Sequence, residues 1–213
     1  GDVSVTIDKY REIKLKLAYF DDVTETGGVR FYGDNTNVLN SANFRNFLIK
    51  EMEQTERMHG SLSVRALRYG TFNAGLTRDR KRITDGYYFD KGTGEPPLEK
   101  PEYIFMEFTA GFRYAYKEKF LEMPDSRISM GTNYPIVWFQ YTRGLEGVLD
   151  GEFAYNKFDL RIQKEFYLKY LGESRFEMLA GYIDNPVPHT NLYNGRGSYR
   201  LITIYAPTSF ATQ

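Results

Sequence analysis

Residues that commonly carry catalysis or metal binding are scarce in this 213-residue chain, which contains two histidines and no cysteine. His59 and His189 are far apart in the sequence, and each lies beside turn-forming residues, so neither indicates a ligand or an acid–base group. Without cysteine the chain has no disulfide, thiolate metal ligand or cysteine nucleophile. We therefore predict that the protein is not an enzyme and that it has no catalytic residue, metal site or cofactor.

Charged and glycine-rich segments give no stronger chemical signal. Asp21 and Asp22 with Glu25 offer oxygen ligands for calcium, but they lack the spacing of a dedicated calcium loop. The segment GTGEPP lacks the strand-then-helix setting of a phosphate-binding loop. Lysine plus arginine equals aspartate plus glutamate at 28 each, and the basic run at 78–82 has no interleaved aromatic residues. No nucleic-acid partner is predicted.

Alternation of apolar and polar residues with a period of two is the main pattern, and it predicts an all-β antiparallel meander. In YIFMEFTAGFRYAY, residues 103–116, every even position is apolar or aromatic. The stretch 3–19 fits either one long strand or two strands joined by a hairpin. The other strands are expected at 62–76, where a pattern at 62–66 resumes with the same parity at 72–76, and at 127–141, 152–169, 175–182 and 199–205, which gives seven or eight strands in total.

Two long surface loops are predicted, at 21–60 and 78–101, within a single region that covers 1–213. The first loop contains SANFRNFLIKEMEQTERM, whose apolar residues Phe44, Phe47 and Leu48 fall on one side of a short helix opened by Ser41. No apolar run approaches the ~20 residues that a membrane-spanning helix requires. Strands of a membrane barrel need only alternate, so they remain compatible with the sequence.

The long apolar face of 103–116 must contact a second protein layer, a ligand or lipid. Soluble strands are about five or six residues long, whereas this stretch runs fourteen and 152–169 runs eighteen. Tyrosines gather at the strand ends, as in the aromatic girdles of membrane barrels. These observations favour a transmembrane β-barrel or part of one. The residues predicted to face lipid are Ile104, Met106, Phe108, Phe112, Phe158, Leu160, Ile162, Phe166 and Leu168. Those predicted to face a polar lumen are Glu107, Arg113, Arg161, Gln163 and Glu165.

A soluble alternative stays open at this point. A secreted β-sandwich or a lipocalin-like binding module also alternates, and its apolar face packs against a second sheet or encloses a small apolar ligand. Lys164, a charge on the apolar parity of 152–169, fits lipid only near an interface.

Several patterned segments together resemble the C-terminal barrel of a Bacteroidetes-type outer-membrane family of unknown function. Members of that family carry an N-terminal carboxypeptidase-regulatory-like domain. The likeness covers most of the chain and is best between Glu107 and Tyr193. The segments that carry it are FRYAYKEKF, RISMGTNYPIVWFQYTRGLEG, FAYNKFDLRIQKEFYL, GESRFEMLAGYI and TSFATQ.

The resemblance implies a location and partners, and it implies no activity. It places the protein in the outer membrane of a Gram-negative bacterium, with a transport-related role or a structural role in a cell-envelope complex. The implied partners are the lipid bilayer, lipopolysaccharide and envelope proteins that the long loops contact. The regulatory-like domain and earlier strands would precede Gly1, and further strands would follow Gln213, so that the barrel here is incomplete.

One short motif has two readings. Arg143 and Gly144 look like the tip of the loop that folds into the lumen of outer-membrane assembly barrels, where an arginine pairs with lumen carboxylates. Glu107, Glu152 or Glu165 would be the partner here. The other reading is an ordinary β-turn in which the glycine supplies a permissive backbone.

Overall fold

The computed structural model describes residues 1–8, 11–25, 31, 52–82, 88–89, 98–99, 102–122, 127–170, 172–193, 196–198 and 209–211. These residues form one eight-stranded antiparallel sheet in the order β1-β2-β3-β4-β7-β10-β11-β12. Its strands are β1 (Asp2–Asp8), β2 (Ile13–Glu25), β3 (Met52–Arg65), β4 (Gly70–Arg82), β7 (Glu102–Ala115), β10 (Ile136–Gly144), β11 (Asn156–Leu168) and β12 (Gly172–Ile183). The predicted all-β antiparallel meander is confirmed.

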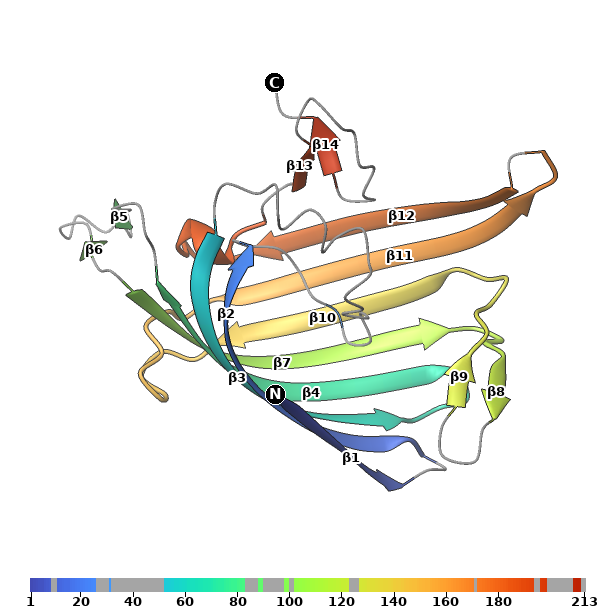
Figure 1. Ribbon diagram of the computed structural model, residues 1–213, viewed down its shortest axis with the longest axis horizontal. Coiled ribbons are helices and arrows are strands. Elements are labelled where there is room, and N and C mark those ends of the chain that lie inside the picture. The colour runs from blue at the N-terminus through green and yellow to red at the C-terminus, as the bar shows by residue number, and fades with distance from the viewer. Residues whose placement is uncertain are drawn as a thin grey trace.

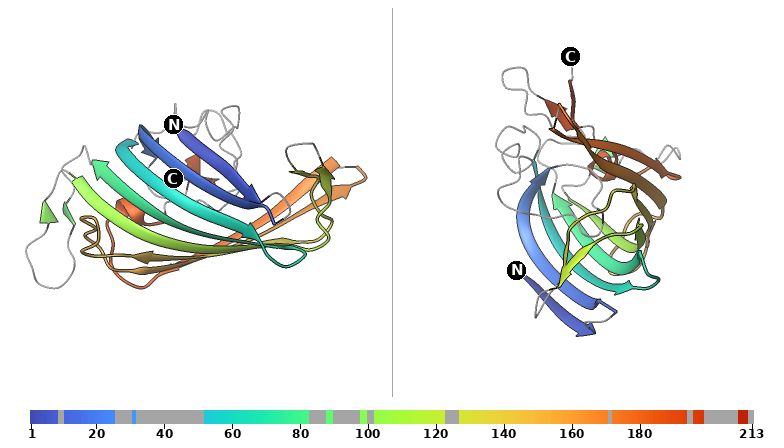
Figure 2. Two further views of the ribbon diagram at one scale, coloured as in Figure 1. Left: turned by 90° about the horizontal axis from the view of Figure 1, so that it is seen from below. Right: turned by 90° about the vertical axis from the view of Figure 1, so that its right-hand side faces the viewer.

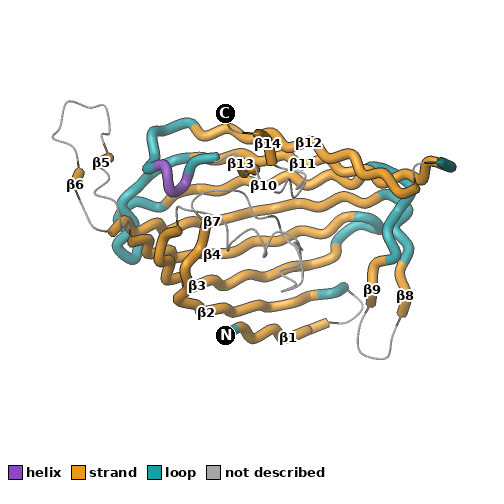
Figure 3. Tube along the Cα trace, turned by 45° about the horizontal axis from the view of Figure 1, so that its top comes forward, coloured by secondary structure: helices purple, strands orange, loops and turns teal. Residues whose placement is uncertain are grey.

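The sheet is strongly curved and has the shape of an open trough (Figures 1 and 2). In the part of the chain that the structure describes, β1 and β12 are the two edges, and the strands do not close into a barrel. A 3₁₀ turn, η1 (His189–Asn191), lies on the concave side (Figure 3). Three small two-stranded units flank the sheet: β5 (Tyr88–Phe89) with β6 (Leu98–Glu99), β8 (Phe120–Glu122) with β9 (Arg127–Ser129), and β13 (Arg196–Ser198) with β14 (Ser209–Ala211).

The two ends of the trough have different connections. At one end, tight turns join β1 to β2, β3 to β4 and β11 to β12, and β8 and β9 lie between β7 and β10. Left-handed residues close these turns, among them Leu67 with φ 65° and Gly172 with φ 79°. We call this the short-turn end. At the opposite end, segments 26–51, 83–101 and 145–155 join β2 to β3, β4 to β7 and β10 to β11; we call it the long-loop end because none of its connections is a tight turn.

Several predicted boundaries are wrong. Residues 52–58 are not helical but form the first half of β3, which pairs with β2 on one side and β4 on the other. Two ladders of backbone hydrogen bonds outweigh the weak helical periodicity there. The rest of the predicted helix, 41–51, lies outside the described residues. The predicted loops are shorter than expected, because β2 extends to Glu25 and the charged run 78–82 belongs to β4.

Other predicted strands divide or fall elsewhere. The stretch 3–19 forms two strands, β1 and β2, joined at a hairpin. The stretch 127–141 splits into β9 and β10, with Tyr134-Pro135 in the break. Proline has no N–H for a strand ladder, which explains why β10 begins only at Ile136. The predicted strand at 199–205 lies outside the described residues.

Candidate functional site

Cross-strand pairing sorts the side chains of the sheet onto two faces. Directly paired residues of neighbouring strands lie on the same face of a sheet. The register of strand pairing therefore assigns each side chain to one of the two faces. We call the face away from η1 the outer face, and the face that η1 covers the inner face. One row of paired residues crosses the middle of the outer face from β4 to β12: Phe72, Phe112, Phe139, Leu160 and Ala180.

Burial on the two faces is the reverse of that in a sheet with an apolar core. Large apolar side chains on the outer face are exposed, with Leu62 46%, Phe139 44% and Phe176 55% accessible. On the inner face, Asp79 and Asp159 are only 4% and 1% accessible. Isolated exposed apolar residues are ordinary, but an apolar face that runs across eight strands marks an interaction surface.

The residues predicted to face lipid lie on the outer face. Phe108, Phe158 and Phe166 are exposed there, while Ile104, Phe112, Leu160 and Ile162 are half-buried among their neighbours. Leu168 belongs to β11 by its backbone, but its side chain lies outside the described part of the structure. Lys164 is exposed on the same face, opposite Phe176 and towards the short-turn end.

Met106 differs from the rest of this set because protein covers it. The segment 145–151 folds over the outer face, where the Leu145 N–H donates to the Met106 carbonyl at 2.8 Å. Gly151 packs so closely that a Cβ there would lie 2.8 Å from the Met106 Cβ. Arg78 holds the segment from the other side, since its Nε donates to the Leu149 carbonyl at 3.1 Å. Met106 is therefore 5% accessible and does not form part of the exposed apolar surface.

Arg143 and Gly144 do not form the inward loop tip. They are the last two residues of β10, and Arg143 pairs with Phe108 on the outer face. Its Nη1 donates to the Asn156 Oδ1 at 2.8 Å, not to a carboxylate of the inner face. Gly144 lies on the inner face beneath the Tyr155 ring, which a Cβ would approach to 2.5 Å. The glycine thus serves close packing in a strand and not a turn.

Ion pairs border the apolar outer face at the long-loop end. Arg80 lies 3.1 Å from Glu102 and 3.7 Å from Glu56, and Arg82 lies 3.6 Å from Glu102. These side chains follow Leu76 along β4 and its neighbours, so the outer face changes from apolar to charged within a few residues.

All five residues predicted to face a lumen lie on the inner face. Arg113 and Arg161 each lie near the Trp138 ring, with Arg161 4.1 Å from its centroid. Gln163 donates to Glu165 at 3.1 Å, and Arg175 donates to Glu165 at 2.8 Å.

Two polar contacts of the inner face were missed by sequence reasoning. Arg57 donates twice to Asp79, with both distances 2.5 Å, and His59 lies 2.8 Å from the Thr77 hydroxyl. Apart from Met58, the stretches 55–59 and 77–81 are polar. They lack the alternation of apolar and polar residues that predicts the other strands, so no local pattern indicates these contacts.

The segment that follows β12 returns over the inner face and closes part of it. Asn191 donates to Glu107 at 3.0 Å and to the Tyr155 hydroxyl at 2.6 Å, and Lys81 donates to the Thr190 carbonyl at 2.5 Å. The Tyr193 hydroxyl donates to Asp159. Beside them an apolar cluster fills the long-loop end of the trough: Phe89, Tyr103, Phe105, Phe153, Tyr155 and Val187. Residues 184–193 thus act as a plug against the described wall.

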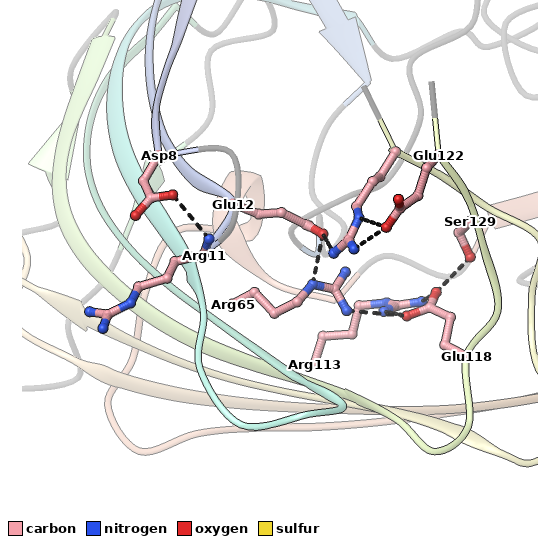
Figure 4. A network of polar contacts seen from close by, with 9 residues as sticks. Asp8, Arg11, Glu12, Arg65, Arg113, Glu118, Glu122 and Ser129 are labelled. Carbon is pink, nitrogen blue, oxygen red and sulfur yellow. Dashed lines mark hydrogen bonds and ion pairs between the residues drawn. The ribbon is translucent and has the colours of Figure 1, made fainter. Parts of the chain in front are cut away.

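A second polar cluster holds the β8–β9 hairpin across the short-turn end (Figure 4). Glu118 accepts hydrogen bonds from both terminal nitrogens of Arg113, at 2.8 and 2.6 Å, and from the Ser129 hydroxyl at 2.6 Å. Arg65 lies 3.0 Å from Glu12 of the β1–β2 turn and stacks 4.4 Å from the Phe120 ring centroid. One cluster therefore ties together the β1–β2 turn, the end of β3, the end of β7 and the hairpin.

The pKa of Glu118 reflects this setting. Burial alone would raise it, but the hydrogen bonds from Arg113 and Ser129 and the charges of Arg113 and Arg65 outweigh burial and lower the pKa below its ordinary value. A carboxylate whose folded pKa is depressed stabilises the folded state above its ordinary pKa. That stabilisation is lost as the pH falls through the lower, folded pKa.

We predict that Glu118→Gln destabilises the protein at pH 7 by about 1–3 kcal/mol, the usual cost of leaving buried donors poorly paired. The difference from the unmodified protein should shrink as the pH falls below the ordinary carboxylate range. Thermal unfolding at pH 7 and pH 3 measures both effects. The matched control is Glu122→Gln in the same hairpin, where the side chain is 69% exposed and the expected change is small. A difference between Glu118→Gln and the unmodified protein that does not vary with pH would contradict the assignment.

Among the residues described, no helix is long and apolar enough to cross a membrane. The described residues also bring together no group of three or more histidine, aspartate or glutamate side chains suited to a metal ion.

Comparison with known proteins identifies the family. Residues 68–185, from the end of the β3–β4 turn to just after β12, match the model of the Family of unknown function (DUF5686) C-terminal domain. The chain belongs to this family. The DUF5686 match includes β4, β7 and β10–β12, and therefore both predicted faces, whereas β1–β3 precede it. No curated protein matches the chain.

Proposed function

We propose that this DUF5686 chain forms part of the wall of a transmembrane β-barrel in the outer membrane of a Gram-negative bacterium. In this proposal the protein is not an enzyme, the outer face contacts lipid hydrocarbon, and the inner face lines the barrel interior. The observation that carries the proposal is the reversed burial of the sheet, with apolar side chains exposed and charged side chains enclosed. A water-soluble protein would bury the outer face.

The extent of the apolar surface supports this proposal. On β7 the outer-face residues are apolar over eleven residues, from Ile104 to Tyr114, with Met106 covered by the segment 145–151. This length matches the roughly 9–11 residues of a tilted membrane strand. The ion pairs of Arg80 and Arg82 then mark the level at which strands leave hydrocarbon for headgroups. Outer-membrane barrels have short periplasmic turns and longer extracellular loops, so the long-loop end would be extracellular and near lipopolysaccharide.

The filled inner face favours a structural role in a cell-envelope complex over an open diffusion pore. Plugged interiors are one of the known arrangements of membrane barrels. Asn191 and Tyr193 bind the wall through Glu107 and Asp159, and these contacts would have to break for solute to pass along it. The segments between β2 and β3 and between β4 and β7 would contact partner proteins at the extracellular side.

The absence of cysteine from the chain allows a direct test by single-cysteine labelling. We predict that cysteines at Leu62, Phe139 and Phe176 react slowly with a water-soluble maleimide when the protein is in native membranes. The control is Tyr170→Cys in the β11–β12 turn, which is 91% exposed and should react fast. After solubilisation and denaturation all four should react alike. Equal labelling at all four positions in intact membranes would contradict the proposal.

A folding assay gives a second, independent readout. The purified chain should acquire sheet structure and unfold cooperatively only with detergent micelles or lipid. A monodisperse protein that folds cooperatively in plain buffer would favour the soluble binding module instead.

A further inference from the structure

The outer face is hollowed around Gly60. A groove of about 520 Å³ lies there, and its walls include Leu17 of β2, Met58 of β3, Leu76 of β4 and Leu149 of the segment 145–151. Leu17, Gly60 and Leu76 are paired in register, so the missing side chain of Gly60 leaves a gap between two leucines. The volume is within the roughly 300–1,000 Å³ typical of ligand sites.

The segment 145–151 gives this groove a wall that the sheet alone does not provide. It projects from the side of the trough away from η1, as the coil between β10 and β11 in Figure 1. Val148 and Leu149 are exposed on it, and Leu149 and Asp150 have left-handed backbones with φ of 47° and 66°. A backbone of this kind is costly outside glycine and here presents an apolar side chain over the groove.

The charge at the groove determines which molecule suits it. Arg78 contributes a guanidinium to the lining of the groove, and none of its described lining residues has an acidic side chain. Asp150 lies 3.5 Å from the Arg78 guanidinium but is 78% exposed, so this ion pair is weak. The groove therefore combines apolar walls with the Arg78 cation. This cation lies near the level of the ion pairs that border the outer face.

We infer that this groove holds an acyl chain of a phosphate-bearing lipid, with the phosphate at Arg78. The inference rests on the proposed function, because a lipid reaches the outer face only if that face lies in a membrane. The apolar walls of the groove exclude water from the acyl chain of the lipid. The Arg78 guanidinium binds the phosphate oxygens by charge-assisted hydrogen bonds. A zwitterionic headgroup gains less at this position, so the site should prefer anionic lipid.

The test measures lipid retained by the detergent-purified protein after incubation with phosphatidylglycerol or phosphatidylcholine, using native mass spectrometry. Gly60→Leu should fill the groove and lower the number of retained phosphatidylglycerol molecules by one. A Cβ at Gly60 lies 3.3 Å from the tip of the Leu17 side chain, which can move, so the variant should fold. The matched control is Ala180→Leu, which places the same side chain on the outer face away from the groove. Arg78→Gln should reduce the preference for phosphatidylglycerol by about fivefold.

Each outcome decides the inference. Loss of one lipid in Gly60→Leu but not in Ala180→Leu supports it, and equal retention or equal loss in the two variants overturns it. An unchanged lipid preference in Arg78→Gln overturns the phosphate contact. If Gly60→Leu does not fold, Leu149→Ala removes a wall at an exposed position and should also lower retention; retention equal to that of the unmodified protein then overturns the inference. Fast maleimide labelling at Leu62, Phe139 and Phe176 in membranes would instead show that the proposed function itself has failed.

Discussion

Phe139→Arg should lower the free energy of unfolding in a lipid bilayer by about 2–4 kcal/mol, the cost of arginine on the lipid face near the bilayer middle. Phe139 lies in the central row of the outer face, between Phe112 and Leu160. In a water-soluble protein the same change would replace a side chain that is already 44% exposed and would cost little. The sign and size of the effect therefore distinguish lipid from water as the medium of this face.

The neighbouring residue provides the control. Gln140 faces the inner side of the same strand, directly opposite Asp159. Gln140→Arg places a cation beside a carboxylate and should cost less than about 1 kcal/mol. Equilibrium unfolding in urea, with both variants refolded into the same lipid vesicles, gives the two free energies. Equal costs at positions 139 and 140 would contradict the assignment of the faces.

Alternation in the sequence was sufficient to predict the two faces of the sheet. A period of two fixes which residues share a side once a segment is a strand, so Glu107 and Phe108 were separated without knowing their neighbours. Pairing then extends the prediction across the sheet, because β7 lies between β4 and β10 and all three keep one register.

Contacts between distant segments were not predictable in this way. Lys81 and Thr190 are 109 residues apart, and no local pattern links a strand to the turn that covers it. The loop tip expected at Arg143 is wrong for a related reason. Whether a loop folds inward or outward depends on packing such as that of Gly151 on Met106, which alternation does not encode.

The charged segment 78–82 led to a wrong prediction of secondary structure. The run 78–82 is predicted to be an exposed loop because all five of its residues are charged. In the structure Arg80 forms ion pairs with Glu56 and Glu102 on the outer face. Asp79 forms an ion pair with Arg57 on the inner face. A strand with charges on both faces is stable only where each face supplies partners, and those partners come from β3 and β7.

Asp79 therefore provides the second large effect. Its carboxylate is 4% accessible and accepts two hydrogen bonds of 2.5 Å from Arg57. Asp79→Ala leaves a guanidinium enclosed without its partner, and breaking a buried ion pair in this way costs about 3–5 kcal/mol. If water filled the trough at this level, it would solvate Arg57 and the loss would be much smaller. The variant thus measures how dry the inner face is.

The control lies on the opposite face at nearly the same height. Glu102→Ala breaks the Glu102–Arg80 pair, whose side chains are 33% and 34% exposed, and should cost less than about 1 kcal/mol. The double variant Arg57→Met/Asp79→Leu should recover most of the stability lost in Asp79→Ala, because it removes both charges and leaves none unpaired. Unfolding free energies of the four proteins in the same micelles test this directly. Similar losses of unfolding free energy for Asp79→Ala and Glu102→Ala would mean that water reaches the inner face as readily as it reaches the ion pairs that border the outer face. The plug formed by 184–193 would then not exclude water from the wall.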